Sequence, residues 1–220
     1  HNAALCFILL GFLFLPIMPA TAATLTVGPG QAYETIQAAV DAASDGDTIN
    51  VKAGTYAEMV DIVTPNLVLR SVDGEKAAIV EGDGSDYCFY VEDGAPVTLD
   101  GFWIKPHGNT GIRLGYDNGV VDAVVAITNN TVESSDYGLY CSASYVTTSQ
   151  VSITGNTARE ASNAGFYWYG FDGCTVNISN NICIDCTDTG MDLEEFDEGL
   201  GADVRIEDNT VTLSEGLTGN

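Results

Sequence analysis

Asp192 and Glu194 are the residues whose types and spacing come nearest to a catalytic pair. They stand two residues apart in a stretch typical of a β-strand, so both side chains leave the same face, roughly 6.5–7 Å apart. An inverting glycosidase needs about 6.5–9.5 Å between its acid and its base. Any outward Asp-x-Glu pair on a strand gives this separation, so the two residues are weak catalytic candidates.

The same pair lies in a dense acidic run between residues 188 and 203. So many carboxylates repel each other unless a cation or solvent intervenes. Calcium takes six to eight oxygen ligands, and the predicted ligands are Asp192, Glu194, Glu195 and Asp197. A solvated acidic surface explains the run equally well, so calcium is one of two open interpretations.

A repeated Gly-apolar-x-apolar pattern begins at Gly111, Gly138, Gly165 and Gly190. Aligning the four copies points the apolar positions inward. The predicted inward residues are Ile112, Leu139, Phe166 and Met191, followed by Leu114, Cys141, Trp168 and Leu193. The outward column is then Arg113, Tyr140, Tyr167 and Asp192. Beside it run Gly115, Ser142, Tyr169 and Glu194.

This outward surface predicts a carbohydrate platform, because tyrosine rings can stack on sugar rings and charged groups can bind hydroxyls. The predicted contacts are Arg113, Tyr116, Tyr140, Tyr167 and Tyr169. A cross-strand aromatic ladder explains Tyr140 and Tyr167 without a ligand, and the residues alone favour it. Arg113 lies three repeats from Asp192, roughly 14 Å at sheet spacing, so the two cannot share a reaction centre.

Composition excludes several classes of function. The 220 residues contain 31 Asp+Glu and 7 Lys+Arg, a formal charge of −24. Such a chain lacks the basic face that binds nucleic acid, and it does not suit anionic lipid. With only two histidines, His1 and His107, a His-rich metal site or a Ser/His/Asp triad has almost nothing to be built from.

The elements that would position these groups follow from a second repeat. Four Ile-x-x-Asn segments end at Asn130, Asn156, Asn181 and Asn209, spaced 26, 25 and 28 residues apart. A unit of this length with short strands cannot bury its own apolar face, so it must stack on copies of itself. The pattern predicts an all-β protein, a parallel β-helix of about 25-residue coils. Because asparagine tolerates left-handed backbone angles, these residues are expected to take such angles in turns, and their side chains are expected to bond each other in a ladder.

The chain before the repeats divides into three predicted parts. Residues 1–22 are predicted to be a signal peptide, because an uncharged apolar run ends in the small-x-small sequence Ala20-Thr21-Ala22. Residues 23–46 are predicted to form a strand and a capping helix, Tyr33 to Ala43, and residues 47–220 the solenoid. We expect an extracellular or cell-surface protein. Both ends of the natural protein are expected to extend further, with membrane contact only through a C-terminal anchor.

The opening of the mature chain resembles that of pectin-lyase-like right-handed β-helix proteins. The resemblance rests on Tyr33-Glu-Thr-Ile-Gln-Ala-Ala-Val-Asp-Ala-Ala, Asp45-Gly-Asp-Thr-Ile-Asn-Val and Gly54-Thr-Tyr-Ala-Glu58. It implies the fold but not an activity, because enzymes and non-enzymes share this opening. The catalytic motifs of pectinesterases and polygalacturonases are absent, so the resemblance supplies no catalytic residue.

Two functions follow as hypotheses. The first is an exported β-helix module that binds a polysaccharide or cell-envelope glycan, or that builds the envelope, without catalysis. The alternative is a polysaccharide lyase or glycoside hydrolase acting on acidic polysaccharide, with an active site partly beyond residue 220.

Five cysteines remain after Cys6 is removed with the signal peptide: Cys88, Cys141, Cys174, Cys183 and Cys186. An odd number leaves at least one without an intrachain disulfide. Cys141 is predicted to be a buried thiol, and Cys174 a partner of Cys183 or Cys186. The CxxC spacing of Cys183 and Cys186 is weak evidence for zinc.

Overall fold

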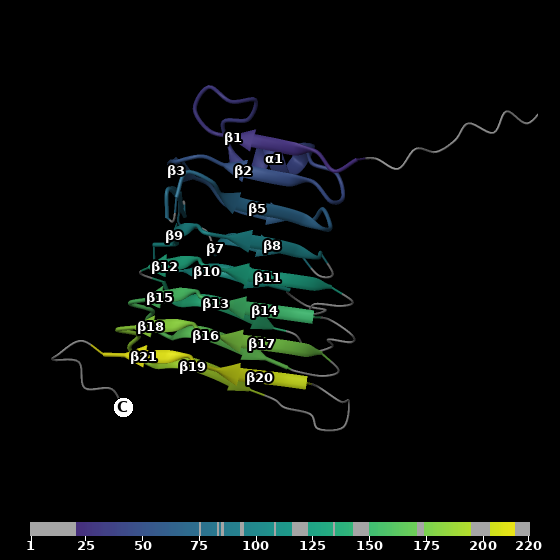
Figure 1. Ribbon diagram of the computed structural model, residues 1–220. Coiled ribbons are helices and arrows are strands. Elements are labelled where there is room, and N and C mark those ends of the chain that lie inside the picture. Colours follow the sequence, from purple (N-terminus) through teal and green to yellow (C-terminus); the bar gives the residue numbers. More distant parts are fainter. Residues whose placement is uncertain are drawn as a thin grey trace, which may run out of the picture.

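The computed structural model describes residues 21–74, 76–82, 84, 86–92, 95–107, 109–115, 123–133, 135–142, 150–170, 174–194 and 203–213. Nearly all of the predicted signal peptide lies outside these ranges. The chain winds as a solenoid of about six turns, and each turn contributes one strand to each of three parallel sheets (Figure 1). The predicted right-handed parallel β-helix is therefore confirmed.

The three sheets are named A, B and C, and neighbouring strands in each come from successive turns. Sheet A consists of β1 (Thr24–Val27), β2 (Thr48–Val51), β5 (Leu67–Ser71), β8 (Val97–Asp100), β11 (Val124–Thr128), β14 (Gln150–Thr154), β17 (Thr175–Ser179) and β20 (Asp203–Glu207). Sheet B consists of β3 (Gly54–Ala57), β6 (Ala78–Glu81), β9 (Trp103–Lys105), β12 (Thr131–Glu133), β15 (Thr157–Arg159), β18 (Ile182–Ile184) and β21 (Thr210–Thr212). Sheet C consists of β4 (Val60–Ile62), β7 (Tyr87–Val91), β10 (Thr110–Leu114), β13 (Tyr137–Ser142), β16 (Ala164–Tyr169) and β19 (Thr189–Glu194).

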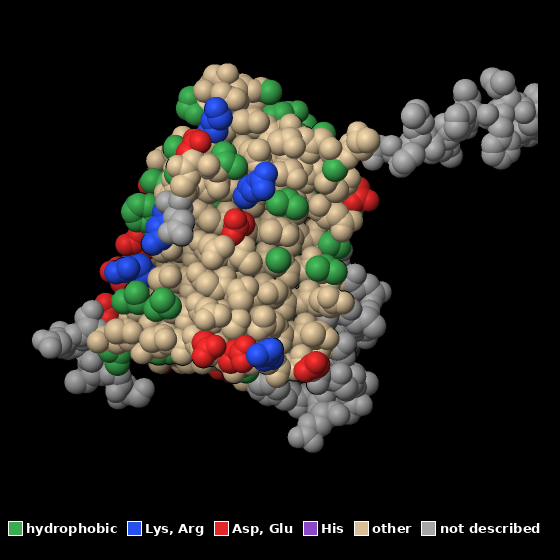
Figure 2. All heavy atoms as spheres, viewed as in Figure 1, with side chains coloured by type: hydrophobic (Ala, Val, Ile, Leu, Met, Phe, Trp, Pro, Cys, Tyr) green, Lys and Arg blue, Asp and Glu red, His purple; other side chains and the backbone are tan. Residues whose placement is uncertain are grey.

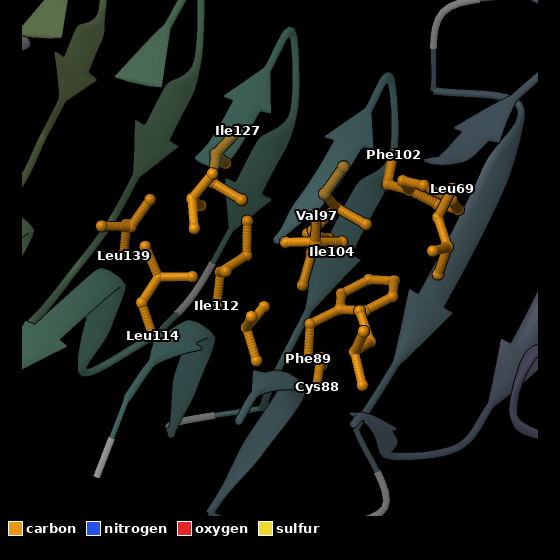
Figure 3. Packing of buried hydrophobic residues seen from close by; sticks show 14 of the residues in the cluster. Leu69, Cys88, Phe89, Val97, Phe102, Ile104, Ile112, Leu114, Ile127 and Leu139 are labelled. Carbon is orange, nitrogen blue, oxygen red and sulfur yellow. The ribbon is translucent and has the colours of Figure 1, made fainter. Parts of the chain in front are cut away.

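The core fills the space between the three sheets. Alternate residues of each strand point inward, so sheet A contributes Leu69 and Ile127, sheet B contributes Ile104, and sheet C contributes Phe89 and Ile112. Figure 3 shows these side chains converging from different strands. Because each coil stacks its apolar residues on the same positions of the next, burial is continuous along the axis.

One short helix, α1 (Ile36–Ala42), packs at the N-terminal end of the described solenoid, beside β1, β2 and β4 (Figure 1). Its residues Ile36, Ala39 and Val40 are buried. The helix begins later than the predicted Tyr33 because Thr35 is its N-cap and accepts a hydrogen bond from Ala38 N. The Glu58 carboxylate accepts hydrogen bonds from the two backbone amides before Ala38, Ile36 N at 2.8 Å and Gln37 N at 2.9 Å.

The predicted asparagine ladder runs through the turns between sheets A and B. The Oδ1 atom of Asn156 accepts from Asn130 N at 3.0 Å, and Oδ1 of Asn181 accepts from Asn156 N at 3.0 Å. The prediction that the ladder residues take left-handed backbone angles is wrong. The residue before each one does so instead, namely Asn129, Gly155, Asn180 and Asp208. That residue turns the chain, which leaves the ladder asparagine free to point inward.

The cysteines differ from the prediction in one pairing. Cys183 and Cys186 form a disulfide with each other, so neither is bonded to Cys174, and the spacing does not mark a zinc site. Cys141 is buried as predicted. Burial raises the pKa of its thiol well above the ordinary value, which keeps it protonated and unreactive.

Candidate functional site

Six outward residues of sheet C form one continuous column across all six strands. The strand register pairs them in the order Asp61, Tyr90, Arg113, Tyr140, Tyr167 and Asp192. We call this column the strip. Its successive members are about 4.8 Å apart, the spacing of paired strands. The inward neighbours Ile112, Leu139 and Phe166 are buried, so the predicted register is confirmed.

Sequence reasoning found four of the six strip residues and missed the first two. Tyr90 and Asp61 lie on β7 and β4, which lack the glycine that marks the later strands. Cys88 occupies the corresponding position on β7, since Tyr87 pairs with Thr110. Extending the inward-outward alternation through Tyr87–Val91 and Val60–Ile62 would have found both residues.

A second outward column, at the start of the same strands, places two more tyrosines beside the strip. Tyr137 packs edge-on against Tyr140 and Tyr167, with ring centroids 5.2 and 5.6 Å apart. A similar pair of tyrosines lies on β7, where the ring centroids of Tyr87 and Tyr90 are 5.1 Å apart. With Tyr169, which follows Tyr167 by two residues on β16, six tyrosines of the described chain lie on this face of sheet C.

The rings of the strip stack on each other. Tyr140 and Tyr167 are nearly parallel, with centroids 4.9 Å apart and planes 17° apart. From the neighbouring strand on the other side, the Arg113 guanidinium lies over the Tyr140 ring at 5.2 Å. Tyr140 is thus covered on both faces, which confirms the aromatic ladder. A ligand on this surface would meet ring edges and phenol hydroxyls rather than an open ring face.

The hydroxyls of Tyr167 and Tyr87 stay protonated at neutral pH. Burial raises the pKa of Tyr167 to about 12, and the carboxylates of Glu194 and Asp192 act in the same direction. Burial also raises the pKa of Tyr87 to about 12, assisted by a hydrogen bond to Asp61. A protonated phenol both donates and accepts, so these tyrosines present hydroxyl groups suited to sugar hydroxyls.

The structure brings together three of the five predicted carbohydrate contacts, Arg113, Tyr140 and Tyr167. Tyr169 lies next to them, two residues beyond Tyr167 on the same strand and paired with Ser142 and Glu194. Tyr116 lies outside the described residues. Whether any of these residues binds sugar stays a prediction.

The predicted acid pair and calcium ligands are only partly within the described chain. Asp192 and Glu194 lie on β19 and pair with Tyr167 and Tyr169, whereas Glu195 and Asp197 fall outside it. Over the part of the chain that the structure describes, no three potential ligand side chains gather into a metal site. The calcium site therefore stays a prediction.

Comparison with known proteins adds the family. The sequence profile described as the right handed beta helix region matches residues 81–217, more than half of the chain. The chain belongs to this right-handed β-helix family. Comparison with curated protein sequences gave no match. Of the helices in the described ranges, none has the length and apolar character to span a membrane.

Solved structures match the chain at low sequence identity, and the first of them shares its fold. A PL6 family alginate lyase, AlyGC, matches with a TM-score of 0.66 and 16% identity, over 92% of this chain and 31% of the lyase. The chain thus spans about a third of that enzyme. The pectin methylesterase from Aspergillus niger matches with a TM-score of 0.47 and 16% identity, over 91% of this chain and 70% of the esterase.

Proposed function

We propose that this β-helix protein binds a polysaccharide chain along the strip of sheet C, without catalysis, as an exported cell-surface or secreted module. The observation that carries the proposal is the in-register column of stacked tyrosines and one arginine, with a carboxylate at each end. Six members at about 4.8 Å give a surface roughly 24 Å long. A linear polymer can repeat its contacts along such a regular surface.

Each kind of group on the strip has a distinct part in this binding. The edges of Tyr140 and Tyr167 contact the apolar C–H groups of sugar rings, and their hydroxyls exchange hydrogen bonds with sugar hydroxyls. Asp61 and Asp192 accept hydrogen bonds from sugar hydroxyls at the two ends. The stack fixes the ring positions before binding, which lowers the entropy lost when the glycan binds.

The net charge of −24 makes neutral glycans the better partners for this surface. A polyanion approaching the protein is repelled, which slows association at low ionic strength. Arg113 is the sole cation of the strip. Binding of a neutral polysaccharide should therefore change little with salt, whereas binding of an acidic one should improve as salt screens the repulsion.

The test is calorimetric titration with a panel of neutral and acidic soluble polysaccharides. Replacing Tyr140 and Tyr167 together by alanine should weaken glycan binding about tenfold, the equivalent of about 1.4 kcal/mol, because ring-edge contacts and two hydroxyls are lost. The Tyr140→Phe/Tyr167→Phe variant keeps the stack and removes only the hydroxyls, so it separates the two contributions and should lose less. Unchanged affinity in a folded alanine variant contradicts the proposal.

A second candidate function, an enzyme acting on acidic polysaccharide, is favoured by one observation. Arg113 lies between Tyr90 and Tyr140 in the register, so a cation that can neutralise a uronate carboxylate adjoins phenols that can exchange protons. The pKa of about 12 on nearby Tyr87 weighs against it, because that phenol is not a base at neutral pH. Release of unsaturated or reducing ends that stops in the Arg113→Ala variant would favour the enzyme; glycan binding without turnover favours the module.

A further inference from the structure

A hollow of about 410 Å³ lies on sheet B, on a different face of the solenoid from the strip. It is lined by Trp103, Lys105, His107 and Glu133, and we call it the Trp103 hollow. The volume is within the range of small-ligand sites, about 300–1,000 Å³. Figure 2 shows that charged side chains gather along the edge where sheet B lies, whereas the face over sheet A is mostly uncharged.

The indole of Trp103 is fixed by two contacts. Its Nε1 donates a hydrogen bond to Glu133 Oε2 on the next strand, at 2.8 Å. The Lys105 ammonium lies over the ring, 4.1 Å from its centroid. Trp103 and Lys105 are two residues apart on β9, so both point outward. The aromatic ring and the cation are therefore held in one place before any ligand arrives.

Lys105 has acidic neighbours on both sides and yet turns to the indole. It pairs with Glu81 on β6, and Glu133 is the next position on β12. In the described ranges, the one ion pair within 4.0 Å joins Arg205 to Glu207. An ammonium has three N–H donors, and a ring face accepts only those directed at it. Lys105 thus keeps donors for a ligand.

The turn after β9 adds a second donor to the hollow. Gly82 N donates a hydrogen bond to Lys105 O at 2.9 Å. Pro106 packs closely on Gly82, because a side chain added at Gly82 would lie 3.0 Å from the Pro106 carbonyl oxygen. His107 follows with a left-handed backbone, φ 55°, and is exposed. Its imidazole donates an N–H in either protonation state.

We propose that the Trp103 hollow binds a single anionic sugar unit, a pyranose bearing a carboxylate or a sulfate. The sugar ring packs against the indole, and its anionic group accepts hydrogen bonds from the Lys105 ammonium and the His107 imidazole. Charge-assisted bonds of this kind are about twice as strong as neutral ones. Glu133 holds the indole by its hydrogen bond but opposes the ligand's charge. This site is independent of the strip and recognises one unit rather than a chain.

Tryptophan fluorescence tests the proposal, because the chain has two tryptophans and the second, Trp168, is 1% exposed. The probes are glucuronate, glucose 6-sulfate and glucose. We expect a saturable emission change with at least one anionic probe and at least tenfold weaker binding of glucose. The two anionic probes distinguish a carboxylate site from a sulfate site.

Four variants define the contacts. Lys105→Met keeps the aliphatic stem on the indole and should weaken anion binding tenfold or more. Glu133→Gln keeps an acceptor for the indole and removes a negative charge, so it should strengthen binding severalfold. Arg159→Met, a cation on the same sheet outside the hollow, and Tyr140→Phe in the strip should change affinity less than about twofold. No saturable response to either anion, equal binding of glucose, or wild-type affinity in Lys105→Met would overturn the proposal.

Discussion

Gly138→Ala is expected to lower the free energy of unfolding by about 3 kcal/mol, the upper part of the range for overpacked sites. A methyl group added at Gly138 would collide with the Gly165 carbonyl of the next coil and would lie 2.9 Å from Ala158 Cβ. One obstacle is backbone and the other is a rigid side chain, so neither can move without shifting a strand. The midpoint of urea denaturation, followed by circular dichroism, measures the loss.

The matched control is Gly54→Ala. The nearest atoms to an alanine side chain there are Tyr56 side-chain atoms at 3.5 Å, an ordinary contact. Its stability should stay within about 0.5 kcal/mol of the wild type. Equal denaturation midpoints for Gly138→Ala and Gly54→Ala would show that close approach of the coils does not explain why glycine recurs at the start of the sheet C strands.

Asn156→Ala is expected to cost about 4 kcal/mol, because it removes the middle of the asparagine ladder. Its side chain accepts from Asn130 N and donates to Ile127 O at 2.7 Å, and both groups are buried. Each buried polar group left without a partner costs about 1–3 kcal/mol. Urea denaturation of the wild type and the variant measures the difference.

Asn209→Ala provides the graded comparison. Asn209 accepts from Asn181 N and donates to Ile178 O at 2.8 Å, but it is only partly buried and bonds a neighbouring coil on one side. Water can replace part of the hydrogen bonding that Asn181 N and Ile178 O lose, so Asn209→Ala should cost less than half as much as Asn156→Ala. A cost at Asn209 equal to that at Asn156 would refute burial as the source of the ladder's stability.

The periodicity of the sequence predicted the solenoid and the alternation of side chains in its later coils, because each coil repeats the positions of the one before it. The recurring glycines marked the repeat in the sequence, but the sequence did not explain why these positions are glycine. The structure supplies the reason, since an added side chain at Gly111, Gly165 or Gly190 would meet the inward residues Val132, Cys183 or Val211 of sheet B. This contact lies between two sheets, and a single strand does not reveal it.

Other features depart from the repeated pattern or depend on contacts between coils. The first two strip residues, Asp61 and Tyr90, were missed because Cys88 stands where the glycine marker recurs. The Cys183–Cys186 disulfide depends on how the chain turns after β18. The Trp103 hollow joins side chains of two coils with a turn residue, His107.

Amide chemical-shift mapping of isotope-labelled protein gives the most direct test of polysaccharide binding by the strip. The ligand is the tightest-binding member of the neutral and acidic panel. We expect shift changes centred on β7, β10, β13 and β16 of sheet C, around Tyr90, Arg113, Tyr140 and Tyr167. Changes confined to sheets A and B, or the absence of saturable binding by every polysaccharide of the panel, would contradict it.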